Sequence, residues 1–146
     1  MSIDEAHMRR ALELAQFQSG RTGVNPAVGC LIVTPDGHVI SEAATGDGGR
    51  PHAEQMALES LSLEQTQGAT AYVTLEPCHQ RSTGEASCST RLIDAKVARV
   101  VVAARDPHPQ GRLGLNRMQD AGIDVKFGVL QGEAEALYQE FFASID

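Results

Sequence analysis

Apolar residues recur along the chain with two spacings, one typical of helices and one typical of strands. Met8, Ala11, Leu12 and Ala15 lie at i, i+3, i+4 and i+7, which predicts an amphipathic helix over residues 3–18. Short apolar or alternating segments indicate strands instead. In chain order the predicted strands are AVGCLIV (27–33), HVISEA (38–43), ATAYVTL (69–75), ARVVVAA (98–104) and IDVKFGV (123–129).

Four further helices are predicted between and after these strands. The first begins near His52 and the second follows Cys88. The third extends from Leu115 to Gly122, and the fourth lies around Ala134 at the end of the chain. The last of them is expected to bury one stripe of apolar side chains. This stripe consists of Leu130, Ala134, Leu137 and Phe141.

The alternation of helices and strands predicts a layered fold in a single domain over residues 1–146. The turn TPDG (34–37) makes the first two strands a β-hairpin. Strands separated by single helices are expected to pair in parallel, through right-handed crossovers. ARVVVAA is apolar on both faces and is expected to be central, whereas IDVKFGV alternates like an edge strand. The predicted fold class is α/β, with three α/β/α layers around a mixed sheet of about five strands.

Composition and charge restrict the classes of partner. The 146-residue chain has a net charge of −7, so a phosphate backbone would be repelled unless basic residues clustered, and the longest basic run is Arg9–Arg10. Four Phe, two Tyr and no Trp leave little for bases to stack on. The N-terminus lacks the order of a signal peptide, and no apolar run approaches the about 20 residues that span a bilayer. We therefore expect a soluble, cytoplasmic protein with a small-molecule partner, and neither nucleic acid nor membrane.

Three side chains are candidate ligands for a soft metal. His52 opens a predicted helix in PHAE, and Cys78 and Cys88 flank the polar loop before the next helix. In a reducing cytosol, two cysteines in such a loop suggest a metal or a reactive thiol before a disulfide. One imidazole and two thiolates suit Zn²⁺ and leave a fourth position for water. The pattern is also compatible with incidental thiols, or with a structural zinc completed by Cys30 or His79.

Glu54 lies two residues after His52, in the first turn of the predicted helix. Neighbours at i and i+2 point apart inside a helix, but in its first turn both side chains can reach a site beyond the helix end. A carboxylate there can take a proton from a metal-activated water and pass it on. Glu54 is therefore the candidate catalytic residue.

Taken together, these motifs resemble the zinc-dependent cytidine and deoxycytidylate deaminase superfamily, whose common signature is H-x-E followed by P-C-x-x-C. In this chain nine residues, instead of two, separate the cysteines. With this spacing the chain is similar to the pyrimidine deaminase domain of the bifunctional riboflavin-biosynthesis deaminase/reductase, over nearly its whole length. The segments that carry the resemblance are NPAVG (25–29), HAE (52–54), YVTLEPC (72–78) and RDPHP (105–109).

The resemblance implies a cytidine-deaminase-like fold and a function. It implies zinc held by His52, Cys78 and Cys88, Glu54 as proton shuttle, and a substrate hydrogen bond from Asn25. The reaction would be hydrolytic loss of an exocyclic amine from a pyrimidine ring. The substrate implied is the riboflavin intermediate 2,5-diamino-6-(phosphoribosylamino)pyrimidin-4-one, and related deaminases imply a homo-oligomer.

Three places depart from the pattern of the riboflavin family. Thr45 stands where the family usually has a histidine, seven residues before His52, and His108 stands where it usually has an asparagine. The loop between the cysteines is one residue longer and lacks paired prolines. In the family these positions help to bind the substrate, so Thr45 and His108 are candidate substrate contacts. Arg81 in this loop is a candidate phosphate ligand, with a solvated loop charge as the competing interpretation.

These departures keep other functions open. The altered positions would suit another substrate, such as cytosine, cytidine or guanine, because pocket hydrogen bonds discriminate between substrates. The sequence is also compatible with a deaminase of tRNA adenosine and with a non-catalytic zinc-stabilised module. Because the chain ends at Asp146, we expect a stand-alone deaminase domain without the reductase domain.

Overall fold

The computed structural model describes residues 2–23, 26–76, 88–105 and 111–139, with the backbone alone at 111–114. The helices and strands, in chain order, are α1 (Ile3–Gln18), β1 (Gly29–Val33), β2 (Val39–Ala44), the 3-10 turn η1 (Asp47–Gly49), α2 (Ala53–Glu59), α3 (Leu63–Thr66), β3 (Thr70–Leu75), α4 (Cys88–Asp94), β4 (Arg99–Ala104), α5 (Gly111–Asp120), β5 (Asp124–Phe127) and α6 (Gln131–Leu137). None of the helices in the described part of the chain is long and apolar enough to cross a bilayer.

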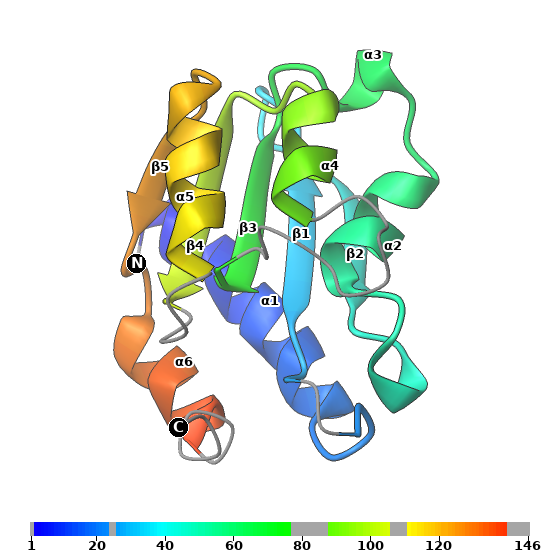
Figure 1. Ribbon diagram of the computed structural model, residues 1–146, viewed down its shortest axis with the longest axis vertical. Helices are drawn as coiled ribbons and strands as arrows, with labels where there is room; N and C mark the ends of the chain where they lie inside the picture. Colours follow the sequence, from blue (N-terminus) through cyan, green and yellow to red (C-terminus); the bar gives the residue numbers. More distant parts are fainter. Residues whose placement is uncertain (1, 24–25, 77–87, 106–110, 140–146) are drawn as a thin grey trace.

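The five strands form one mixed sheet in the order β2-β1-β3-β4-β5 (Figure 1). β1 pairs antiparallel with β2 and also with β3, whereas β3, β4 and β5 run parallel to one another. The predicted hairpin, the interior position of β4 and the edge position of β5 are therefore confirmed. The predicted parallel pairing of β2 with β3 is wrong, because β1 lies between them.

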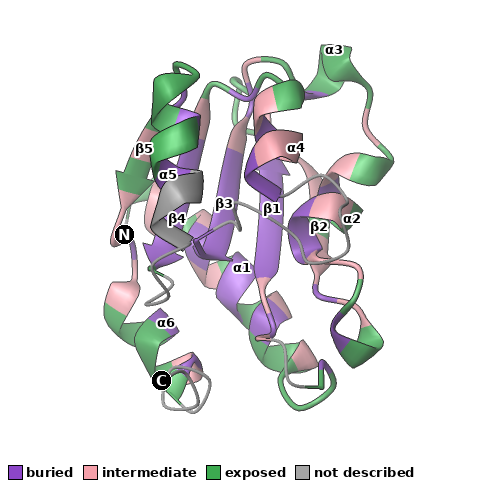
Figure 2. Ribbon diagram, viewed as in Figure 1, coloured by how far each residue is buried: buried purple, intermediate pink, exposed green. Residues whose placement is uncertain are grey.

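Helices cover both faces of the sheet, as the predicted three-layer class requires. α2, α4 and α5 pack on one face, where Ala57, Leu92 and Met118 are buried in a common cluster (Figures 1 and 2). α1 and α6 pack on the other face, where Met8 and Ala134 belong to a second cluster. Strand side chains alternate between the two clusters because successive residues of a strand point to opposite faces.

The long helix α1 has the bounds that its periodicity predicts. Its four buried residues are Met8, Ala11, Leu12 and Ala15. The helix begins after Ser2, whose hydroxyl accepts a hydrogen bond from the Glu5 backbone N–H at 3.1 Å. This contact satisfies one of the backbone donors that a helix start leaves without a partner.

Three helices differ from the pattern-based expectation. The short α3 was not expected from apolar periodicity; it begins with a capping box in which Ser62 and Gln65 bond reciprocally. α5 begins at Gly111, four residues before the expected start. In α6 the buried positions are Ala134 and then Tyr138, immediately after the helix, while Leu137 is half-buried. Phe141, the last residue of the expected stripe, lies outside the described residues.

Candidate active site

Two of the three predicted metal ligands lie in the described part of the chain, and they meet there. His52 immediately precedes α2, and Cys88 is the first residue of α4. These helices pack beside each other on the same face of the sheet (Figure 1). His52 Nδ1 lies 3.3 Å from Cys88 Sγ, although 36 residues separate them in the sequence. The fold thus brings an imidazole nitrogen and a fully buried thiol sulfur to one point.

The spacing of these two atoms fits a shared zinc ion. Bond lengths of about 2.3 Å to sulfur and about 2.05 Å to nitrogen, at a tetrahedral angle, put the two donor atoms about 3.5 Å apart. The 3.3 Å separation is close to this value. Cys78, the third predicted ligand, lies outside the described residues. Among the residues that the structure describes, no three His, Cys, Asp or Glu side chains are grouped to hold a metal.

Glu54 lies in the first turn of α2, two residues after His52. Its side chain is buried, with 4% exposure, and it shares the sheet-facing side of α2 with Ala53 and Ala57. The charge of the carboxylate contributes to the pKa of two other buried groups. Burial raises the pKa of the Cys30 thiol, and the charge of Glu54 raises it further. Burial also raises the pKa of Tyr138, opposed by a hydrogen bond from Thr74, and Glu54 adds to the rise.

Thr45, a predicted substrate contact, lies directly after β2 and is 2% exposed. Its hydroxyl accepts a hydrogen bond from the Val28 backbone N–H at 2.9 Å. Its own backbone N–H donates to the Val28 carbonyl, also at 2.9 Å. The Thr45 hydroxyl is therefore bound to the segment that enters β1, while the Gln18 side chain of α1 donates a hydrogen bond to the Thr45 carbonyl at 2.9 Å. The other predicted substrate contacts, Asn25, Arg81 and His108, lie outside the described residues.

Sequence reasoning missed two buried hydroxyl groups that bond to each other and to the segment that enters β1. Tyr138 donates a hydrogen bond to the Ala27 carbonyl at 2.7 Å. Its oxygen also lies 2.6 Å from the Thr74 hydroxyl of β3. A signal was present in the sequence, because Tyr138 lies four residues after Ala134 on the buried side of the last helix. A buried tyrosine usually needs a hydrogen-bond partner for its hydroxyl.

The amino-acid sequence is similar to those of known deaminases. Residues 1–104 match the family described as the cytidine and deoxycytidylate deaminase zinc-binding region. Over 140 residues the chain is 49% identical to the riboflavin biosynthesis protein RibD of Escherichia coli (strain K12). This alignment covers 94% of this chain and 37% of that protein. The chain thus spans well under half the length of this relative.

Two solved structures share the fold over 98% of this chain. Acinetobacter baumannii RibD, form 2, aligns with a TM-score of 0.90 at 40% identity, over 40% of its own chain. The Thermotoga maritima protein named diaminohydroxyphosphoribosylaminopyrimidine deaminase/5-amino-6-(5-phosphoribosylamino)uracil reductase aligns with a TM-score of 0.89 at 36% identity, over 41% of its chain. These likenesses confirm the predicted cytidine-deaminase-like fold. With the match over residues 1–104, they establish that the chain belongs to the cytidine and deoxycytidylate deaminase zinc-binding family.

Proposed function

We propose that this chain is a zinc-dependent hydrolytic deaminase that removes an exocyclic amine from a pyrimidine-type small molecule. The observation that carries the proposal is the 3.3 Å approach of His52 Nδ1 to Cys88 Sγ, with the buried Glu54 two residues after His52. Family membership and the 49% identity to a riboflavin biosynthesis protein support it. The substrate proposed first is 2,5-diamino-6-(phosphoribosylamino)pyrimidin-4-one, which matches the deaminase activity named for the Thermotoga maritima relative.

The proposed roles divide between metal binding, proton transfer and substrate recognition. His52, Cys78 and Cys88 would hold the zinc ion, whose Lewis acidity makes water a nucleophile near neutral pH. Glu54 takes a proton from water and delivers it to the ring nitrogen beside the amino-bearing carbon. Glu54 then takes the remaining proton from the added water oxygen and delivers it to the departing amine, so that this oxygen becomes the carbonyl oxygen. The net reaction replaces the exocyclic amine by a carbonyl oxygen and releases ammonia.

The surroundings of Glu54 suit this proton-transfer role. Its carboxylate is held in the first turn of a helix and is shielded from bulk water, so its position relative to His52 is set by the backbone. A buried carboxylate exchanges protons with groups inside the site rather than with solvent. The proposal assigns substrate recognition to Asn25, Thr45, Arg81 and His108.

The proposal extends to partners and location. A net charge of −7 favours a small molecule over nucleic acid. A homo-oligomer and a cytoplasmic location are also proposed, the first from the resemblance to other deaminases. The second suits ligand cysteines that must remain reduced to bind zinc.

The decisive experiment measures ammonia release by the purified zinc-loaded protein from the diaminopyrimidinone substrate. Wild type is expected to turn it over. Glu54→Gln should lower kcat by about 10²- to 10⁴-fold, the usual contribution of a positioned acid–base group, while the zinc content stays at the wild-type level. Glu59→Gln on the exposed side of the same helix serves as the control and should leave the rate unchanged.

An active Glu54→Gln protein, with its metal in place, would contradict the role of Glu54. A second candidate function is deamination of another nucleobase or nucleoside, and the threonine at position 45 and the histidine at position 108 favour it. Activity on cytosine, cytidine or guanine, with none on the diaminopyrimidinone, would replace the first substrate by the second class. Absence of zinc from freshly purified, unchelated protein would overturn both.

A further inference from the structure

Three buried hydroxyl groups hold three consecutive residues of the segment that enters β1. We call them the hydroxyl clamp. Each is at most 2% exposed, and each comes from a different part of the chain. The members of the hydroxyl clamp are Thr45, directly after β2, Thr74, near the end of β3, and Tyr138, directly after α6.

Each hydroxyl of the clamp binds a different backbone group. Thr45 accepts from the Val28 N–H at 2.9 Å, and Thr74 accepts from the Gly29 N–H at 3.0 Å. Tyr138 donates to the Ala27 carbonyl at 2.7 Å. Residues 27 and 28 precede β1, and the hydroxyls supply the hydrogen bonds of the Val28 amide and the Ala27 carbonyl.

The direction of the inner hydrogen bonds follows from the number of protons. The Ala27 carbonyl has no proton, so the single hydroxyl proton of Tyr138 is used there. The 2.6 Å contact between Tyr138 and Thr74 must then use the Thr74 proton. The result is a continuous series of hydrogen bonds from the Gly29 N–H through the Thr74 and Tyr138 hydroxyls to the Ala27 carbonyl. Loss of any member leaves a buried polar group without its partner, which is costly.

The segment held by the clamp leads into a strand that packs against the helix of the candidate acid–base residue. β1 packs against α2, and Cys30, the residue after Gly29, is buried in the same cluster as Ala53, the neighbour of Glu54. The segment held by the clamp therefore leads to the start of α2, where Glu54 lies. Asn25, the proposed substrate contact, is two residues before Ala27 in the sequence.

We propose that Thr45, Thr74 and Tyr138 are positioning residues that fix residues 27–29 relative to the start of α2, and thereby set substrate affinity. This inference rests on the proposed function. For Thr45 it specifies how recognition works: the hydroxyl acts through the Val28 amide, not through direct contact with the substrate. For Tyr138, the inference assigns a positioning role to the residue that follows α6, although α6 lies on the opposite face of the sheet from α2.

The test compares variants that delete a hydroxyl with variants that retain it. Thr45→Val, Thr74→Val and Tyr138→Phe each remove the hydroxyl at nearly constant volume, and Thr45→Ser and Thr74→Ser retain it. On zinc-loaded protein with the diaminopyrimidinone substrate, the three deletions should raise KM about fivefold to tenfold, the equivalent of one hydrogen bond. The kcat should stay within about twofold, the zinc content should not change, and the serine variants should restore KM.

An unchanged KM in all three deletion variants would overturn the proposal. Serine variants as impaired as the valine variants would also overturn it, because volume and not the hydroxyl would then be responsible. A fall in kcat without a rise in KM would assign the hydroxyls to the chemical step and would reject the positioning role. Tyr138→Phe keeps the ring in the core, so it remains informative if a threonine variant does not fold.

Failure of the proposed function is recognised separately, because wild-type protein would then release no ammonia from this substrate. In that case, amide hydrogen exchange tests the hydrogen bonds of the clamp directly. Thr45→Val should expose the Val28 amide and Thr74→Val the Gly29 amide to faster exchange, with protection restored by serine. Unaltered protection at both amides would overturn the clamp.

Discussion

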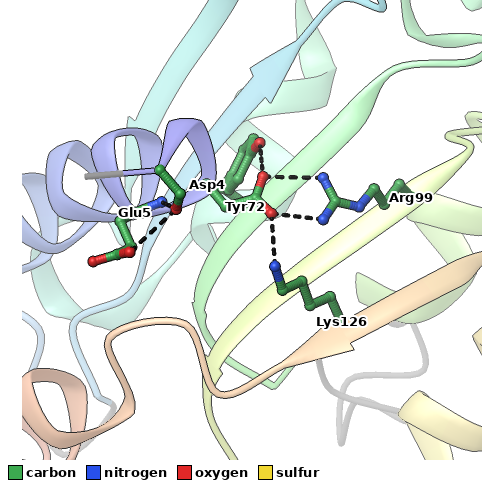
Figure 3. A network of polar contacts seen from close by, with 6 residues as sticks. Asp4, Glu5, Tyr72, Arg99 and Lys126 are labelled. Carbon is green, nitrogen blue, oxygen red and sulfur yellow. Dashed lines mark hydrogen bonds and ion pairs between the residues drawn. The ribbon is translucent and has the colours of Figure 1, made fainter.

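At the scale of single residues, Asp4 shows how one carboxylate connects distant parts of the chain. It lies in the first turn of α1 and accepts a hydrogen bond from the Tyr72 hydroxyl at 2.7 Å (Figure 3). Arg99 binds both of its oxygens, at 3.0 and 2.6 Å, and Lys126 Nζ lies 3.1 Å away. Hydrogen bonds from Arg99, above all, lower the pKa of Asp4 below its ordinary value. This contact group fixes the start of α1 to β3, β4 and β5.

The lowered pKa of Asp4 predicts a pH-dependent effect on stability. Because the folded pKa is below the unfolded value of about 3.9, the stabilisation is complete above that pH and is lost as pH falls toward the folded pKa. Asp4→Asn should lower the free energy of unfolding by about 1–3 kcal/mol at pH 7. The difference from wild type should shrink below about pH 4. Urea unfolding of both proteins at each pH between about 3 and 8, with chelator present throughout so that metal loss does not contribute, measures both quantities.

Asp120→Asn, at an exposed position of α5, is the matched control for this measurement. It should change stability by less than about 0.5 kcal/mol at any of these pH values. A difference between Asp4→Asn and wild type that persists undiminished at low pH would show that charge is not the cause.

At the scale of elements, the packing of α1 against β1 depends on the absence of one side chain. A Cβ atom added at Gly29 would lie 1.9 Å from the Ala11 carbonyl oxygen of α1. This oxygen belongs to the backbone, so no change of rotamer can relieve the overlap. The close approach lets α1 bury Met8 and Ala11 completely.

Gly29→Ala is therefore expected to be strongly destabilising. α1 or β1 must move, and overpacking of this kind costs about 1–3 kcal/mol or more. Thermal unfolding measures the loss. Gly132→Ala in α6 is the control, since its added Cβ meets no atom within 4 Å and alanine favours a helix by about 0.5–1 kcal/mol. Equal stability of the two variants would contradict the close contact.

At the scale of the whole molecule, the proposed zinc ion would join elements that are distant in the sequence. His52 and Cys88 belong to the starts of two helices, and Cys78 belongs to the segment between β3 and α4. A ligand that binds only the folded state stabilises it, by about 2.7 kcal/mol at a free concentration one hundred times its Kd. Such a difference corresponds to a shift of about 5–10 °C in Tm for a chain of this size.

Removal of zinc by a chelator should thus lower Tm by about 5–10 °C, and added zinc should restore it. Differential scanning calorimetry with elemental analysis of each sample makes the comparison. Glu54→Gln retains the proposed ligands, so it should respond to chelation as wild type does. A Tm that is insensitive to chelation, in protein that contained zinc beforehand, would show that the metal does not connect these elements.

Sequence reasoning predicted much of the architecture because helix and strand periods are local properties. The stripe from Met8 to Ala15 needs only the 3.6-residue period to predict a helix, and the observed bounds of α1, Ile3–Gln18, equal the predicted ones. The interior strand β4 is likewise defined by its own apolar run. The short α3 has no such stripe, and its capping box with Ser62 identifies it better than hydrophobicity does.

The candidate site was predictable from residue types, but not its geometry. Histidine and cysteine are residue types that Zn²⁺ prefers, and the resemblance carried by HAE and EPC implies the deaminase chemistry. The roles of His52, Cys78, Cys88 and Glu54 remain predictions. Tyr138 escaped notice because nothing local to it indicates a partner 111 residues away in the sequence.

The sequence by itself determined the repeating local patterns, the three-layer class and the chemically distinctive side chains. Only the tertiary structure decided that β1 lies between β2 and β3, that His52 meets Cys88, and that three hydroxyls converge on residues 27–29. The physical reason is the range of the interactions. Period and propensity act between neighbours along the chain, whereas strand order and side-chain convergence result from packing both faces of one sheet at once.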